Sequence, residues 1–253
     1  MMKKFVSLIL ALTLVVCVFS ACSKKDDNVL TMATNAAFPP YEYKDGDKIV
    51  GIDAEIAAEI AKKLDMELEI VDIEFGSIVS GVQSGKFDMG MAGLTVTEDR
   101  KKSVNFSDTY ATGVQVVIVK EDSAIKSVDD LAGKDIKIGV QQDTTGDIYA
   151  SDTPENGGYG EDHVVRYKTG ADAVEALKTG KVSCVIIDNE PAKSFVKANK
   201  GLKILETEYV TEDYAIAISK DNKELLEKIN KALEELKKDG TIDKIVAKYI
   251  PAE

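Results

Sequence analysis

The chain has 253 residues, with 32 basic and 44 acidic side chains and a formal net charge of −12 at neutral pH. A chain this acidic is not expected to bind nucleic acid, because that binding depends on basic side chains that neutralise phosphates. Its length allows two modest domains or one large one.

The N-terminal 21 residues have the features of an export signal. Lys3 and Lys4 precede an apolar run, Phe5 to Val18, that is too short for a comfortable membrane span. The run leads into Ser20-Ala21-Cys22, which resembles the bacterial lipobox. We therefore expect a signal peptide over 1–21, lipid on Cys22 and a polar tether over 22–28. An ordinary signal peptide with an incidental cysteine is the alternative. Cleavage would remove two lysines and leave a net charge of −14, from 30 basic and 44 acidic residues.

From residue 29 onwards, segments with strand and helix patterns alternate along the first half of the chain. Strands are expected at 29–34, 66–73, 87–93 and 114–119, and a short helix at 77–85. Asp53 is expected to cap a longer helix that carries Ile56, Ile60 and Leu64 on one face. Such alternation predicts an α/β fold with a mainly parallel sheet covered by helices.

A second set of alternating segments follows. Ser127 and Asp130 have the spacing of a capping box, and 153–159 is rich in turn residues. Asn189, Asn222 and Thr241 are each expected to cap a helix. The expected elements are strands at 136–140, 183–187 and 214–219, and helices at 172–177, from 189 to about 198, from 222 to 240 and from 241 onwards.

Several motifs then stand in the order found in one family. They are Asn35-Ala36-Ala37-Phe38-Pro39-Pro40-Tyr41-Glu42-Tyr43, Gly51-Ile52-Asp53, the segment Gly93-Leu94-Thr95-Val96-Thr97-Glu98-Asp99-Arg100 with Phe106-Ser107-Asp108 after it, Gln141-Gln142-Asp143-Thr144-Thr145-Gly146, and Asp188. Across about 220 residues, the chain resembles the amino-acid-binding proteins of bacterial ABC importers, in the polar amino acid group.

The resemblance implies a periplasmic-binding-protein-like fold: two α/β lobes, two extended crossings and a ligand cleft between the lobes. The crossings are placed near 110–114 and 209–213. Lobe 1 is then 29–112 plus 211–253, and lobe 2 is 113–210. A cleft between domains is also a preferred place for a ligand site.

A free amino acid in such a cleft needs a partner for each of its charges, because burying an unpaired charge is costly. The guanidinium of Arg100 can bond both oxygens of a carboxylate, and the resemblance makes it the carboxylate partner. It also makes Asp188 the partner of the ammonium group. Either residue read alone would be ordinary: a solvated surface arginine, or the N-cap of the helix that follows.

The resemblance implies further contacts. The Thr145 N–H would meet the ligand carboxylate, and the Thr95 hydroxyl and the Gly93 carbonyl would also bond the ligand. Phe38 and Phe75 would form walls around its side chain, with Tyr41 and Glu42 as weaker candidates at the rim. Asn35 stands where many relatives that bind cationic or amide side chains carry Asp, and Asn holds no charge. We expect a long, polar, non-acidic ligand side chain.

A stand-alone carrier has two alternatives, an enzyme and a sensor domain. A few members of this structural family are dehydratases, but His163 is expected to be solvated and Cys184, alone in an apolar run, to be a core residue. A sensor domain would need an output module, and the chain ends soon after its last helix. We therefore expect no enzymatic activity, no cofactor and no metal. The expected partners are an amino acid, the permease subunits of an ABC transporter and, through the lipid, the outer face of the cell membrane. The protein is expected to be monomeric.

Overall fold

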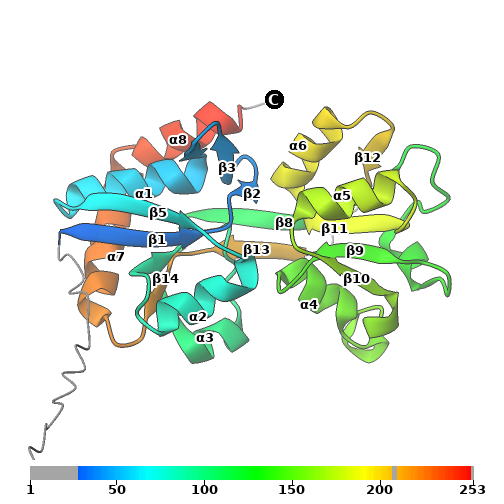
Figure 1. The fold of residues 1–253 in the computed structure, drawn as a ribbon, viewed down its shortest axis with the longest axis horizontal. Coiled ribbons are helices and arrows are strands. Elements are labelled where there is room, and N and C mark those ends of the chain that lie inside the picture. Colours follow the sequence, from blue (N-terminus) through cyan, green and yellow to red (C-terminus); the bar gives the residue numbers. More distant parts are fainter. Residues whose placement is uncertain (1–27, 207–209, 252–253) are drawn as a thin grey trace, which may run out of the picture.

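The computed structural model describes residues 28–206 and 210–251 and shows two α/β lobes side by side (Figure 1). The expected two-lobed α/β fold is therefore confirmed. Of the helices in these two ranges, not one has the length and apolar character that crossing a bilayer requires.

The first lobe is built on a five-stranded sheet in the order β5-β1-β6-β14-β7. Its strands are β1 (Val29–Thr34), β5 (Glu67–Asp72), β6 (Met89–Gly90), β7 (Val104–Phe106) and β14 (Ala217–Ser219). The strands β5, β1 and β6 run parallel, and β14 is antiparallel to β6 and β7. A small antiparallel sheet of β2 (Ala37–Phe38), β3 (Glu42–Asp45) and β4 (Lys48–Val50) extends from it.

Helices cover both faces of the first sheet. The apolar side chains of α1 (Ile52–Lys63), α7 (Lys223–Lys238) and α8 (Thr241–Tyr249) share one core cluster, whereas α2 (Ile78–Gln83) packs in another; α3 (Glu98–Ser103) lies beside α2. The expected cap of α7 is confirmed, because Asn222 accepts a hydrogen bond from the Leu225 N–H. The N-caps predicted at Thr241 and Asn189 are wrong by one residue. The N-cap residues are Gly240 and Asp188, and Thr241 and Asn189 are the first helical residues.

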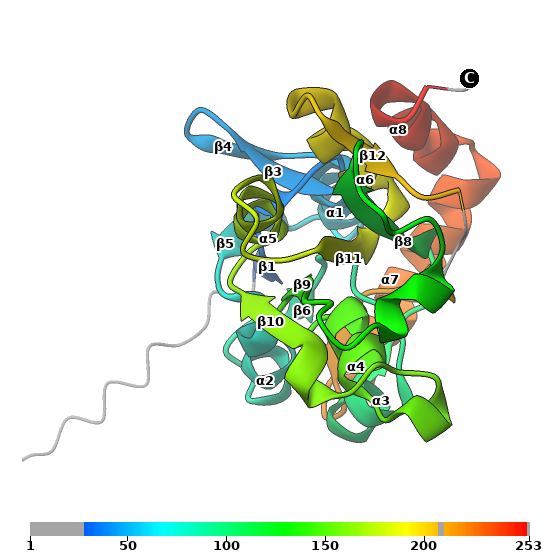
Figure 2. The same ribbon diagram turned by 90° about the vertical axis from the view of Figure 1, so that its right-hand side faces the viewer.

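The second lobe has a sheet in the order β10-β9-β11-β8-β12, with β13 paired to β8. Its strands are β8 (Ala111–Lys120), β9 (Ile138–Gln141), β10 (Val164–Tyr167), β11 (Cys184–Asp188), β12 (Leu202–Ile204) and β13 (Val210–Tyr214). Helix α4 (Thr145–Ser151) lies on one side of this sheet, and α5 (Gly170–Lys178) and α6 (Asn189–Ala198) lie on the other (Figure 2). Single-turn 3₁₀ helices occur at Phe75–Ser77, Pro154–Asn156 and Glu161–His163, and a longer one at Val128–Ala132 begins with the expected capping box.

Two antiparallel strands connect the lobes. Residues 111–115 of β8 pair with 210–214 of β13, and both strands run between the lobes in Figure 1. They lie at the two segments expected to cross; the exact lobe boundaries stay a prediction. The expected single strand over 214–219 is wrong, because β13 ends at Tyr214 in the crossing and β14 begins at Ala217 in the first sheet.

Three further predictions need correction. The strand expected over 87–93 is only Met89–Gly90, since the next residues turn toward the cleft. His163 is half-buried, with its Nδ1 3.0 Å from the Ile136 carbonyl oxygen, and not fully solvated. Asp53 does not cap α1: the N-cap is Gly51, and the Asp53 side chain is buried and accepts hydrogen bonds from the Gly93 N–H and the Tyr110 hydroxyl.

Candidate functional site

The residues expected to contact the ligand line one cavity between the lobes, with the exception of the rim candidate Tyr41, which is buried behind it. Its volume is about 20 Å³, which is room for a single water molecule. The lining comprises Asn35, Phe38, Phe75, Gly93, Thr95, Arg100, Thr145 and Asp188, together with Glu42, Ala92, Gln141 and Thr144. These residues lie at strand ends and in the turns that follow them, which is where open α/β sheets place their ligands.

Arg100 is held at the cavity by the start of α3. The Thr97 side chain caps this helix by accepting a hydrogen bond from the Arg100 N–H. The guanidinium of Arg100 donates to the Thr95 carbonyl at 2.8 Å and to the Asp143 carbonyl, in the other lobe, at 3.0 Å. Its carbon lies 5.3 Å from the centre of the Phe75 ring, a cation–π arrangement. Desolvation lowers the pKa of Arg100, an effect that Glu212 and other acidic groups oppose.

Hydrogen bonds join the two lobes across the cavity. Gln141 Nε2 donates to Asn35 Oδ1 at 2.9 Å, and the hydroxyl oxygens of Thr95 and Thr145 are 3.5 Å apart. The Asn35 amide is oriented by a second bond, in which its Nδ2 donates to the Ile73 carbonyl. These contacts define a closed arrangement of the lobes, so a free amino acid could enter only after they separate.

Asp188 ends β11 inside this cavity. It occupies the N-cap position of α6, but its side chain makes no capping hydrogen bond there. The carboxylate instead accepts a bond from the Tyr214 hydroxyl. Burial, followed by repulsion from Glu212, raises the pKa of Asp188 to about 7. A buried carboxyl group of this kind gains most from a cation brought by a ligand.

Three more carboxyl groups are buried in this part of the protein. They belong to Glu42, Asp53 and Glu212, and Glu212 has one buried oxygen without a hydrogen-bond partner among the described residues. Burial raises the pKa of Asp53 to about 6, and burial together with Asp53 raises the pKa of Glu42 well above its ordinary value. No ion pair within the described ranges involves any of these groups. This part of the site therefore favours a cationic group.

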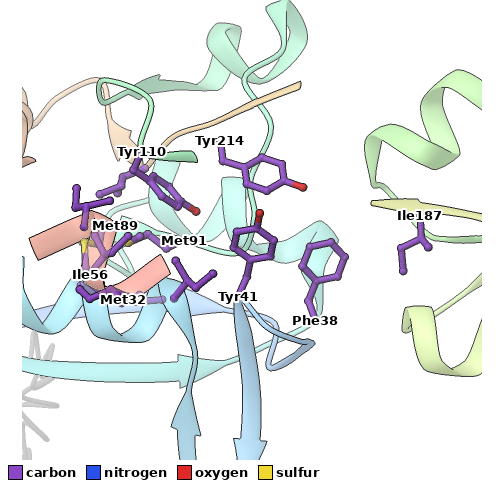
Figure 3. Packing of buried hydrophobic residues seen from close by; sticks show 14 of the residues in the cluster. Met32, Phe38, Tyr41, Ile56, Met89, Met91, Tyr110, Ile187 and Tyr214 are labelled. Atoms are coloured by element: carbon purple, nitrogen blue, oxygen red, sulfur yellow. The ribbon is translucent and has the colours of Figure 1, made fainter. Parts of the chain in front are cut away.

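The ring of Phe38 lines the cavity and belongs to a cluster of aromatic side chains. Phe38 stacks on Tyr41 with ring centres 6.1 Å apart, and Tyr41 meets Tyr214 edge-on at 5.2 Å. Figure 3 shows these three rings next to one another, on the side of the first lobe that faces Ile187 of the second. Gly93 permits this packing: its φ is +51°, and a Cβ atom there would lie 2.9 Å from the Phe38 ring.

Some residues of the site have a larger role than their sequence context indicates. Glu42 was expected at the rim but is fully enclosed, and Gln141 and Thr144 were seen only as parts of a motif. Glu212 had no signal at all, because it lies in a short polar stretch between two apolar segments. Only the pairing of β13 with β8 brings Glu212 next to the cavity.

Comparison with known proteins agrees with this architecture. The model of the bacterial extracellular solute-binding proteins, family 3, matches residues 30–252. The arginine-binding extracellular protein ArtP of Bacillus subtilis is 34% identical, with all of both chains covered. A solved structure of an ancestral arginine-binding protein bound to glutamine superimposes with a TM-score of 0.81 at 42% identity, covering 90% of this chain and all of that one. AncCDT-1, an ancestral amino acid-binding protein described as a precursor of cyclohexadienyl dehydratase, gives 0.80 at 33% identity, covering 88% of this chain and 95% of that one.

The chain thus belongs to family 3 of the bacterial extracellular solute-binding proteins, which confirms the family expected from its motifs. Membership in this extracellular family implies a place outside the cytoplasm. The relatives' own names describe binding proteins of amino-acid transport.

Proposed function

We propose that this protein is a lipid-anchored substrate-binding protein that captures a free amino acid between its lobes and delivers it to the permease of an ABC transporter. One observation carries the proposal: a guanidinium and an unpaired buried carboxyl group, from opposite lobes, line the same cavity. This pairing matches the two charges that every free amino acid presents. The similarity to arginine-binding proteins supports the same conclusion.

In the bound state we assign the ligand carboxylate to Arg100 and the ammonium group to Asp188. Thr95 and Thr145 would add hydrogen bonds from the two lobes, and Gly93 would supply a carbonyl acceptor. Because these partners come from both lobes, the complete set exists only when the lobes are closed, so the ligand shifts the population toward the closed form.

The ligand's side chain should be long and polar and should not be acidic. Phe38 and Phe75 offer flat surfaces for a guanidinium, imidazole or amide group, and Glu42 adds a buried acidic group to the lining. Asn35, held by Gln141 and Ile73, is the neutral polar group beside them. Asn35→Asp should therefore shift the preference toward lysine or arginine, because a carboxylate can pair with a cation.

A thermal-shift screen tests the binding proposal directly. The protein without its signal peptide is incubated with each standard amino acid, ornithine and cystine, since a ligand that binds only the folded state raises the Tm. We expect the largest shifts for arginine, lysine, histidine or glutamine. The absence of any shift would refute amino-acid capture, and tightest binding of glutamate would refute the side-chain assignment alone.

The anchor is tested separately, because Cys22 lies outside the described residues. Cys22→Ser should abolish lipidation and leave unprocessed precursor, whereas Cys184→Ser should leave processing unchanged. Membrane fractionation and intact-mass measurement distinguish the two. Normal mature mass and membrane association in the Cys22 variant would contradict the lipoprotein assignment.

An enzyme of the same fold is the second candidate, favoured by one feature: the carboxyl group of Asp188 has a pKa of about 7, which suits proton transfer near neutrality. The thiol of Cys184 offers no such chemistry, since burial raises its pKa to about 12. Mass spectrometry of the bound amino acid after long incubation decides between them, because a binding protein returns its ligand unchanged.

A further inference from the structure

Glu212 lies next to the proposed ligand site, on the strand by which the chain returns to the first lobe. It is 4% exposed, although it is not part of the cavity wall. Its Oε2 accepts hydrogen bonds from the Thr95 hydroxyl at 3.2 Å and from the Gln115 amide at 2.9 Å. Glu212 thereby joins a residue of the first lobe to the outgoing crossing strand.

The same network reaches Asp188. Gln115 is paired with Asp188 across β8 and β11, and its side-chain amide, which donates to Glu212, also acts to lower the pKa of Asp188. Gln115 Nε2 is also 3.4 Å from the Thr145 hydroxyl. The two carboxyl groups therefore lie near the same side chain in a buried space, where like charges repel strongly.

We propose that Glu212 is a further positioning residue of this amino-acid site: it holds the Thr95 hydroxyl and, through its negative charge, keeps a proton on Asp188 until the ligand's ammonium group displaces it. This inference rests on the proposed function. One proton leaves the Asp188 carboxyl group for the solvent, and the ammonium N–H then donates to the carboxylate that remains. No other bond is made or broken.

The groups around Asp188 agree with this assignment. Glu212 and Tyr214 face it from β13, Glu42 from the start of β3 with Tyr41 just before it, and Arg100 from α3. Arg100 is the cation of this set, and its guanidinium bonds are directed at two carbonyl groups and not at Asp188. Without a ligand, protonation of a carboxyl group reduces the buried negative charge at the lowest cost in free energy.

A purely structural role would not require a charge at Glu212. A glutamine has the same shape and an amide oxygen that could still accept from Thr95 and Gln115. What glutamine lacks is the negative charge, which repels the ionised form of Asp188 and raises the pKa of that group, second only to burial. Glu212→Gln therefore separates positioning from proton retention.

Calorimetric titration with L-arginine and L-glutamine, in buffers of different ionisation enthalpy, measures the displaced proton. Since the pKa of Asp188 is about 7, the wild type should release roughly half a proton per ligand at neutral pH. Its affinity should fall as the pH drops from about 7 toward 5, by up to about tenfold per pH unit. Ligand binding lowers the number of bound protons, so acid opposes binding.

The Glu212→Gln variant should release clearly fewer protons per ligand at neutral pH, and its affinity should depend less on pH. The Glu98→Gln variant, changed at an exposed position, should match the wild type in both measurements. Carbon-13 NMR of the Asp188 carboxyl group in the wild type gives a second measurement, because its titration near neutrality should disappear with ligand. Bound ligand without proton release, or equal release in Glu212→Gln and wild type, would overturn this inference and leave amino-acid capture intact. Failure of every amino acid to bind would overturn both.

Discussion

The acidic side chains of this protein fall into two groups, which differ in their exposure to water and in whether a cation pairs with them. On the surface, Glu98, Glu59 and Glu175 each pair with a lysine three residues away, at distances between 2.6 and 2.9 Å. At the cleft, the carboxyl groups of Asp188 and Glu212 are buried, and neither forms an ion pair within residues 28–206 and 210–251. Exposed pairs contribute little to stability, whereas buried unpaired carboxyl groups are costly. Acidic groups without a cationic partner are thus concentrated where a ligand would supply the missing charge.

Replacing the cation of the cleft should break this arrangement most severely. Arg100→Lys keeps the charge but removes the planar fork that bonds a carboxylate through two N–H groups. We expect the free energy of amino-acid binding to weaken by about 2–4 kcal/mol, as for one partner of a buried charged pair. Isothermal calorimetry measures the loss.

The chain provides a matched control, because Arg166 is its other arginine. Arg166 bonds Asp147 and Glu161 and does not line the cavity. Arg166→Lys should therefore leave the affinity unchanged. Wild-type affinity in Arg100→Lys would remove Arg100 from the proposed site.

Neutralising the buried acid should have opposite effects on binding and on stability. Asp188→Asn should weaken binding strongly, because the ammonium group loses its counter-charge. The ligand-free variant, in contrast, should be more stable than the wild type at about pH 8, since it no longer holds a buried charge. A lower Tm than wild type at that pH would contradict the assigned cost of Asp188.

The sign of the pH dependence follows from the raised pKa. Folded Asp188 has a pKa of about 7, against roughly 4 in an unfolded chain. The folded state therefore binds more protons between these values, and the free energy of unfolding falls as the pH rises through that window. Thermal denaturation from about pH 5 to pH 8 should show a smaller fall in Asp188→Asn. Asp53, whose pKa is raised to about 6, contributes with the same sign to both proteins, so their difference isolates Asp188.

Much of the fold could be predicted because its signals are local. The strand over Val29–Thr34 and the helix after Asn222 were placed correctly from apolar periodicity and a capping residue. The break between Tyr214 and Ala217 could not be, since the sequence is apolar throughout and the two strands part only because they pair in different sheets.

The acidic part of the site was harder to predict, because its contacts also join residues that are distant in the chain. Asp53 has the sequence context of a helix cap, yet Gly93 and Tyr110, distant in the chain, draw its side chain into the interior. Glu212 reaches Thr95 across more than a hundred residues of sequence. The order of the motifs identified Arg100 and Asp188 as candidate site residues. No pattern in a single sequence predicts which buried acidic residues lie beside them.

A smaller effect is expected from the hydrogen bond that closes the lobes without using any charge. Gln141→Ala removes the donor to Asn35 Oδ1, and one such bond contributes about 0.5–1.5 kcal/mol. We expect a lower affinity and a more open ligand-free protein, seen as a larger radius of gyration in small-angle X-ray scattering. Gln142→Ala, next to it but outside the cavity lining, is the control. An unchanged radius and affinity would mean that this bond does not bias closure.

The smallest effect should come from the surface group of acids. Glu98 and Lys101 are 2.9 Å apart, with 87% and 50% of their side chains exposed. Water and salt screen such a pair, and holding two long side chains in one geometry costs entropy. Glu98→Gln should therefore shift the Tm by less than about 2 °C, with less effect still in high salt. The same Glu→Gln change at position 212 removes a charge that water does not screen, so its effect on stability should persist in high salt. If both variants lost the same stability with the same salt dependence, burial would not distinguish the two groups of acids, and the excess of acid in the cleft would need another explanation.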